Sequence, residues 1–124
     1  MQKFISNYED ACAKLGRSTE LPDVSKWSPK LQRHLTALHK LDTLLEVNNA
    51  GWEGDLANIE QKKWYPVFDI INDEDAPGGF RLSFFGSVYV SVNSDLGVRP
   101  ACCSEELSDF MGRNCPNLYK DLHS

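Results

Sequence analysis

A single leucine stripe runs through the segment from Lys30 to Asn48, and this feature constrains the fold most. Ser28-Pro29 precedes the stripe as an N-cap followed by a proline at the first helical position, and Gly51 ends it. A helix of about 20 residues is ~30 Å long and therefore spans a domain of this size. The leucines that recur at helical spacing are Leu31, Leu35, Leu38, Leu41 and Leu45.

A shorter helix is predicted before it. The string from Ser6 to Glu9 fits a capping box, in which the serine and glutamate side chains satisfy free backbone donors. Gly16 is a typical C-terminal stop, and residues 17–28 form a polar connector to the long helix. The apolar face of the short helix consists of Tyr8, Ala11, Cys12 and Leu15.

Strand character dominates the second half of the chain. The range 63–71 is aromatic and β-branched, and Pro66 within it marks an edge or a bulge because proline donates no ladder hydrogen bond. After a turn at 72–79, apolar and polar residues alternate over 80–84 and again over 88–92, with Gly86 as a tight turn between them. A fourth short strand is expected over 98–103. These ranges predict a four-stranded antiparallel meander.

The C-terminal segment has a helical pattern. Ser104 is a suitable N-cap, and Glu105 and Glu106 suit the positive end of the helix dipole. Apolar positions from Leu107 to Leu122 stay in helical phase across Pro116, which favours one kinked helix over two separate ones; Gly112 and Pro116 are the positions that would split it. The prediction is a single α+β domain over 1–124, with two N-terminal helices, a four-stranded meander and a C-terminal helix.

Composition agrees with one self-sufficient domain. The chain has 124 residues and a mass of 14.0 kDa, for which area scaling gives a folded surface of ~6,700 Å² and burial of roughly two-thirds of the unfolded surface. A net charge of −5 disfavours nonspecific binding to a nucleic-acid backbone. No apolar run reaches the roughly 20 residues of a membrane helix, and the N-terminus turns acidic before a signal peptide could form. We expect a cytoplasmic protein with no membrane contact.

Cysteines and histidines do not form a recognisable reactive site. The four cysteines include the adjacent pair Cys102 and Cys103, lack C-x2-C spacing and are expected to be reduced thiols. His34 and His39 lie five residues apart and point to different faces of the long helix. We therefore expect no catalytic residue, no metal site and no cofactor, and the sequence shows no small-molecule substrate.

The densest charge cluster lies in the turn between the first two predicted strands. Asp69, Asp73, Glu74 and Asp75 could offer oxygen ligands to a divalent cation, but EF-hand spacing is absent. A solvated hairpin tip is the favoured interpretation. Asp73, Glu74 and Asp75 are candidate contacts for a partner.

Aromatic residues are numerous in the second half. Such residues stack nucleic-acid bases on some sheets, but no basic residue lies between Lys63 and Arg81 or between Arg81 and Arg99. Core packing is favoured for most of them. Phe85 falls on the face opposite Phe84, where it contacts a second layer or lies exposed at a partner surface, and Trp52 in the loop at 51–61 is a further candidate contact.

Five strings of the sequence are distinctive, those at 8–16, 62–68, 79–82, 97–107 and 117–122. They resemble a family of uncharacterised small proteins from phages and mobile elements of Bacteroides-type gut bacteria. They cover both ends and most of the chain, although Pro116 interrupts what looks like an unbroken final helix in that group. The resemblance implies a phage or mobile-element origin and a location in the host cytoplasm or the virion, and it implies no activity.

The leading hypothesis is a non-enzymatic accessory protein of a phage or mobile element that binds another macromolecule. One version inhibits a host defence or DNA-processing protein, with the acidic hairpin meeting a basic nucleic-acid groove. A virion or assembly component that self-associates through exposed strand edges is the first alternative. A weak single-stranded nucleic-acid binder is the second.

Overall fold

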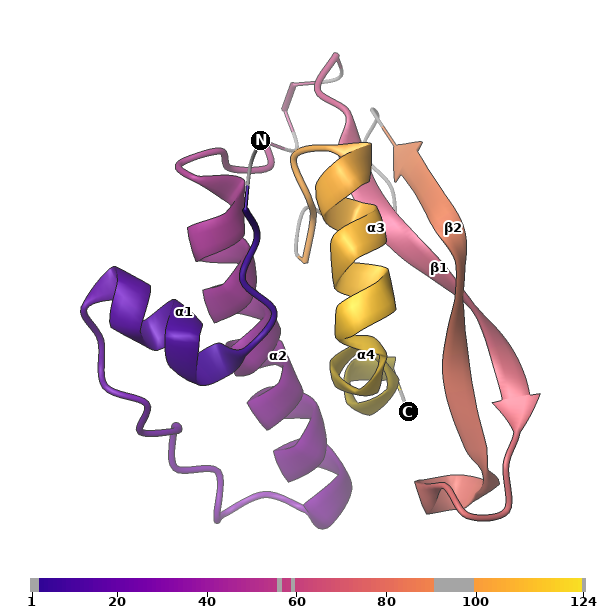
Figure 1. Ribbon diagram of the computed structural model, residues 1–124. Coiled ribbons are helices and arrows are strands. Elements are labelled where there is room, and N and C mark those ends of the chain that lie inside the picture. The colour runs from indigo at the N-terminus through magenta and orange to yellow at the C-terminus, as the bar shows by residue number, and fades with distance from the viewer. Residues whose placement is uncertain (1–2, 56, 59, 91–99, 124) are drawn as a thin grey trace.

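The computed structural model describes residues 3–55, 57–58, 60–90 and 100–123 and shows an α+β fold in three layers (Figure 1). Helix α1 (Tyr8–Leu15) packs on α2 (Pro29–Asn49), and α2 packs on α4 (Pro116–His123). Helix α3 (Glu105–Asn114) and α4 support a hairpin of β1 (Lys63–Asn72) and β2 (Phe80–Val90). A short 3-10 turn, η1 (Pro77–Gly79), lies between the two strands.

The long helix begins and ends where its sequence indicates. The Ser28 hydroxyl accepts a hydrogen bond from the Leu31 amide at 3.3 Å, and Pro29 is the first helical residue. The chain leaves the helix through Ala50 and Gly51, both with positive φ, of 51° and 92°. The predicted helix is therefore confirmed at both ends to within a residue or two.

Two further caps were predicted, and one of them is wrong. The Ser104 hydroxyl accepts from the Leu107 amide at 3.1 Å, which confirms the start of α3. Helix α1 is capped by Asn7, whose side-chain oxygen accepts from the Asp10 amide at 2.8 Å, and not by Ser6. Asparagine and serine are equally good N-caps, so the sequence pattern alone does not decide whether Ser6 or Asn7 caps the helix.

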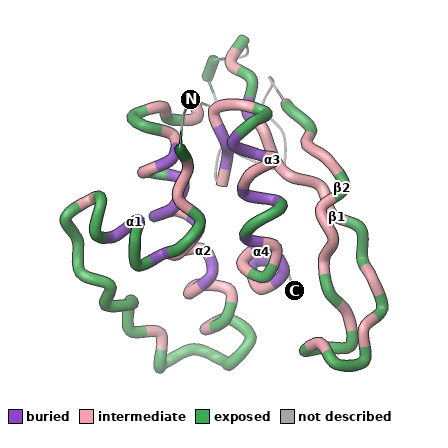
Figure 2. Tube along the Cα trace, viewed as in Figure 1, coloured by how far each residue is buried: buried purple, intermediate pink, exposed green. Residues whose placement is uncertain are grey.

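The core lies among the helices (Figure 2). Only the C-terminal part of the leucine stripe is deeply buried, since Leu41 is inaccessible whereas Leu31 is 38% exposed. The hairpin is mostly half-buried or exposed (Figure 2). The buried apolar cluster comprises Ala11, Ala37, Leu41, Leu44, Leu45, Cys102, Leu107, Met111, Cys115, Tyr119 and Leu122.

The predicted four-stranded meander is wrong, first because β2 is one continuous strand. The range 80–90 passes through Gly86 without a turn. Val67 pairs with Gly86 and Phe68 pairs with Phe84, so Phe85 is an extra residue in a β-bulge. A glycine between two alternating runs resembles a turn in the sequence, but here it adjoins the bulge. Residues 91–92, which end the predicted third strand, lie outside the described residues.

The predicted fourth strand is reduced to one bridge in the part of the chain that the structure describes. The Trp64 amide donates to the Cys102 carbonyl at 3.0 Å, and the Cys102 amide donates back at 2.9 Å. Residues 98–99 of that predicted strand lie outside the described residues. The sheet described here is the two-stranded antiparallel pair of β1 and β2.

The single kinked C-terminal helix is also corrected. Helix α3 ends at Asn114 and α4 begins at Pro116, with Cys115 between them. Pro116 occupies the first position of a new helix, where its missing N–H is tolerated. Gly112, the other suspected break, lies inside α3.

Candidate functional site

The predicted partner-binding residues occupy three separate places. Asp73, Glu74 and Asp75 lie at the tip of the hairpin, and Phe85 lies midway along β2. Trp52 follows the C-terminal end of α2 in the sequence, and that end of α2 lies far from the hairpin tip (Figure 1). The structure therefore does not combine them into one site.

At the hairpin tip, Asp73 differs in role from its acidic neighbours. Its carboxylate accepts a hydrogen bond from the Asp75 amide at 3.1 Å and lies 3.6 Å from the Arg81 guanidinium. Its own amide donates to the Gly79 carbonyl at 2.9 Å. Asp73 thus shapes the turn, whereas Glu74 and Asp75 are exposed and available for contact.

Lys120 anchors this tip from α4. Its side chain is buried, and its ammonium donates hydrogen bonds to the backbone carbonyls of Pro77 and Phe80. The same ammonium lies 4.2 Å from the centre of the Phe80 ring. Sequence reasoning missed this contact because Lys120 lies 43 and 40 residues after Pro77 and Phe80 in the sequence.

The bulge sends the two adjacent phenylalanines to different environments. Phe84 packs toward α3, with the Arg113 guanidinium 5.1 Å from its ring centre. Phe85 is 72% exposed. Of the two alternatives for Phe85, a second layer or an exposed surface, the structure supports exposure.

Beyond the bulge, the alternation of β2 changes phase. The Ser87 hydroxyl contacts α3, lying 2.7 Å from the Ser108 hydroxyl and 2.6 Å from the Asp109 carboxylate. Val88 is 48% exposed. One extra residue therefore turns a serine toward the helices and leaves a valine exposed.

The two strands have different outer edges. The backbone N–H and carbonyl of Trp64 both bond to Cys102, and so they do not bond to Tyr89, the residue opposite on β2. Trp64 and Tyr89 are therefore a non-hydrogen-bonded pair of the antiparallel ladder. In such a pair the backbone groups of Tyr89 point away from β1. Pro66 lies at the next such position of β1 and carries no N–H. Cys102 thus pairs with the edge of β1 at Trp64, and Pro66 offers no N–H at the next position, whereas no described residue pairs with the outer edge of β2.

Large exposed hydrophobic side chains of the described residues fall in two regions. Four belong to the hairpin: Ile70, Phe85, Val88 and Tyr89. The other three, Leu21, Trp27 and Leu31, belong to the connector and the first turn of α2. We use the name hairpin surface for Phe85, Val88 and the open edge of β2. Tyr89 lies on the other face of the strand, where its ring centre is 5.0 Å from that of Trp64.

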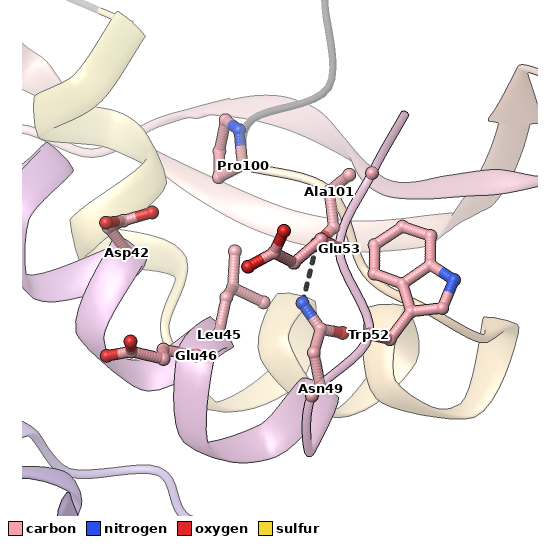
Figure 3. A pocket seen from close by; sticks show the side chains of 10 residues that line it. Asp42, Leu45, Glu46, Asn49, Trp52, Glu53, Pro100 and Ala101 are labelled. Carbon is pink, nitrogen blue, oxygen red and sulfur yellow. Dashed lines mark hydrogen bonds between the residues drawn. The ribbon is translucent and has the colours of Figure 1, made fainter. Parts of the chain in front are cut away.

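Trp52 forms one wall of a pocket of about 250 Å³ (Figure 3). Three carboxylates line the pocket, from Asp42, Glu46 and Glu53, and Glu46 pairs with Arg17. The Asn49 side chain donates to the Ala101 carbonyl at 3.0 Å and accepts from the Cys103 amide at 2.8 Å. Asn49 therefore joins α2 to the segment before α3, and the pocket is part of this junction.

Two of the buried thiols, Cys102 and Cys115, are poor nucleophiles. Burial raises the pKa of Cys102 to about 12 and that of Cys115 to about 11, so the reactive thiolate is scarce at neutral pH. Burial also raises the pKa of the Tyr8 hydroxyl to about 12. That hydroxyl lies 3.1 Å from His39 Nε2. Across the described residues, no group of three or more His, Cys, Asp or Glu side chains is arranged to hold a metal ion.

Comparison of the chain with protein-family models, with curated proteins and with solved structures finds no match. None of the described helices combines the length and apolar character needed to cross a membrane. The function is therefore argued from the geometry.

Proposed function

We propose that the protein acts by binding another protein through the hairpin surface. The observation that carries this proposal is Phe85, which the bulge leaves 72% exposed on a strand with an open edge. An exposed phenylalanine gains free energy when a partner covers it, and phenylalanine is among the residues enriched in protein interfaces.

The open edge of β2 suggests how the partner docks. An extended segment of the partner would add as a further strand and satisfy the outward backbone groups, including those of Tyr89. Val88 and Phe85 would supply the apolar contacts that select side chains of the partner. This mode explains why the edge and the exposed aromatic occur on the same strand.

The hairpin tip favours a basic partner. Between residues 69 and 81 the chain carries four carboxylates and one arginine, and Glu74 and Asp75 are exposed. Such a surface complements a nucleic-acid groove of a host defence or DNA-processing protein. This partner class also fits the resemblance to phage and mobile-element proteins and a place of action in the host cytoplasm.

Self-association is the second candidate function, because the same open edge could pair with a second copy of the chain. A virion or assembly component would use it in this way. Single-stranded nucleic acid fits less well, since the acidic tip would repel its phosphates.

Site-specific photo-crosslinking tests the proposal. A photoreactive phenylalanine analogue replaces Phe85 or Val88 in the intact chain, within the cells that carry the gene. We expect discrete adducts with another protein from both positions, and far less from the analogue at Lys14 on the exposed side of α1. Equal yields from Lys14 would contradict the proposal. An adduct with twice the mass of the chain would instead support self-association.

Charge variants test the role of the tip. Replacing Glu74 with Gln and Asp75 with Asn preserves the turn that Asp73 forms, and it should lower the crosslinking yield from position 85. The matched control replaces Glu105 and Glu106 with Gln at the start of α3, which removes the same charge at the other end of the molecule. An equal effect of both pairs would show that only net charge matters.

A further inference from the structure

Positive charge is concentrated where the connector joins α2, although the whole chain has a net charge of −5. The range 24–41 contains three lysines and one arginine and no aspartate or glutamate. The first turn of α2 has no acidic residue, so the positive end of the helix dipole adds to these charges. We use the name basic patch for Lys26, Trp27, Lys30, Leu31 and Arg33.

The basic patch is exposed, and its cations are unpaired. All five of its residues are exposed, and Trp27 is 47% exposed. In the part of the chain that the structure describes, no carboxylate forms a salt bridge with Lys26, Lys30 or Arg33. Hydrogen bonds hold the connector against α2, because the Trp27 amide donates to the Val24 carbonyl at 3.1 Å and the Gln32 side chain donates to the Trp27 carbonyl at 2.7 Å. The patch is therefore a fixed surface that combines positive charge with exposed apolar side chains.

The hairpin tip is a surface of the opposite charge in the same chain. Glu74 and Asp75 are exposed, and among the described residues no lysine or arginine forms a salt bridge with either carboxylate. Ile70, two residues before the end of β1, is 72% exposed and adds an apolar side chain. The tip thus complements the basic patch in charge, and both surfaces include apolar side chains that a partner would cover.

The two surfaces lie side by side at one end of the molecule. Figure 1 shows the beginning of α2 and the hairpin tip both at the lower end of the view, with the tip to the right. A second copy related by a two-fold axis perpendicular to this view brings its tip to the basic patch of the first copy and its basic patch to the tip of the first. Two identical contacts then form together, as in an isologous dimer.

This arrangement also discriminates between kinds of partner. An anionic membrane or a nucleic acid is negative over its whole surface, and it would repel the tip that lies at the same end as the basic patch. A second copy presents both signs of charge and matches both surfaces. We propose that two copies of this chain associate with the hairpin tip of each on the basic patch of the other.

This dimer goes beyond the proposed hairpin surface, because it uses neither Phe85 nor the open edge of β2. It covers Glu74 and Asp75, so a basic partner protein would compete with the second copy for the tip. The two proposals are tested separately, since the dimer needs only the purified chain, whereas crosslinking from Phe85 and Val88 reports another protein in cells.

Sedimentation equilibrium of the purified full chain over a range of concentrations tests the dimer. We expect a monomer–dimer equilibrium whose Kd rises at least about tenfold between about 0.1 M and about 1 M sodium chloride, because the Debye length shortens from about 10 Å to about 3 Å. A chain that stays monomeric at every concentration would overturn the proposal. A dimer that is insensitive to salt would overturn it as well and would point to pairing through the edge of β2.

Charge-reversed variants identify the surfaces that meet. Lys30→Glu with Arg33→Glu in the basic patch, or Glu74→Lys with Asp75→Lys at the tip, should each raise Kd at least about tenfold, because like charges that meet across an interface cost several kcal/mol. An equimolar mixture of the two variants should recover a Kd within about threefold of the wild type, since each contact again joins opposite charges.

The control replaces Glu53 and Glu60 with Lys in the segment between α2 and β1, where both residues are exposed. It changes the net charge by the same amount as the tip variant, and its Kd should stay within about threefold of the wild type because it lies outside both surfaces. An unchanged Kd in either reversed variant, a mixture as weak as its components, or an equal loss in the control would contradict the proposal.

Discussion

Two lysines are buried in this protein, and each donates to backbone carbonyl groups. Lys63 is 2% exposed, and its ammonium lies 3.2 Å from the Asn58 carbonyl and 3.3 Å from the Gln61 carbonyl. Lys120 is 8% exposed and bonds to the carbonyls of Pro77 and Phe80. A buried ammonium is tolerated only when such acceptors replace its water, so Lys63 fixes the segment before β1 and Lys120 fixes the turn of the hairpin.

Replacement of Lys120 by Met should therefore cost stability. Methionine fills similar space but leaves the Pro77 and Phe80 carbonyls without their cationic donor. We expect the free energy of unfolding to fall by about 1.5–3 kcal/mol, the range for hydrogen bonds to charged groups. Urea denaturation measures the change. Lys14→Met on the exposed side of α1 should stay within about 0.5 kcal/mol of the wild type, and an equally small effect at Lys120 would contradict this role.

Thiol reactivity should differ among the four cysteines. Cys12, Cys102 and Cys115 are buried, and Cys103 alone is half-exposed. With the pKa of Cys102 near 12 and that of Cys115 near 11, a thiol reagent at neutral pH should modify Cys103 first. Cys103→Ser should abolish the fast phase in the native protein, and all remaining thiols should react in denaturant. A fast phase that survives this substitution would show an accessible thiolate elsewhere.

Residue roles were predictable from sequence where the partner is a near neighbour. Ser28 and Ser104 cap amides three residues away, and the local pattern reveals both. Lys120 acts on carbonyls 40 or more residues distant, and no periodicity links them. Trp52, chosen for its aromatic character alone, lines a junction pocket that only the fold creates.

At the scale of elements, Gly112 is a point of close contact between α3 and the sheet. A Cβ atom at that position would lie 2.2 Å from Phe84 Cδ1 and 2.9 Å from Pro66 Cβ. Side chains cannot approach so closely, so the helix and the strands meet over a glycine for steric reasons. In the sequence this glycine suggested a helix break; in the structure it is a packing contact.

Gly112→Ala should therefore destabilise the protein even though alanine is the better helix former. The gain in helix propensity is about 1 kcal/mol, and overpacking of a tight contact costs typically 1–3 kcal/mol. We expect a lower thermal midpoint by calorimetry. Gly86→Ala is the control, because no atom lies within 4 Å of a Cβ built there. A more stable Gly112→Ala variant would show that α3 moves away at little cost.

The bulge explains why the elements of the sheet were miscounted. The apolar residues of the ranges 80–84 and 88–92 are all even-numbered, so the sequence alternates in one phase throughout. The extra residue Phe85 is what turns Val88 to the exposed face. A sequence pattern with a glycine between two alternating runs fits a turn or a bulge equally well. Pairing with β1, in which Phe68 faces Phe84 and Val67 faces Gly86, decides between them.

At the scale of the whole molecule, the surface is larger than that of an average compact protein of this mass. The accessible area is 7,989 Å², against the ~6,700 Å² expected from area scaling. The hairpin has one face on α3 and α4, and the connector is mostly exposed (Figure 1). The hairpin surface, through which we propose that a partner binds, belongs to the first of these two segments.

Helix α4 joins the layers, and this makes the cooperativity of the fold testable. It packs on α2 on one side and on β2 on the other, and Leu122 within it is 6% exposed. Because an isolated two-stranded hairpin is marginally stable in water, the hairpin should depend on α4 for its order. Leu122→Ala should destabilise the whole domain by about 2–5 kcal/mol.

Amide hydrogen exchange distinguishes one cooperative unit from two. If the chain folds as the single domain that its sequence predicts, Leu122→Ala should accelerate exchange by the same factor at Leu44 in α2 and at Leu82 in β2, because both open only by global unfolding. The control Leu31→Ala, at a position 38% exposed, should change both rates little. Acceleration at Leu44 with no change at Leu82 would mean that the hairpin is held by α3 and Lys63 alone, and the layers would then unfold separately.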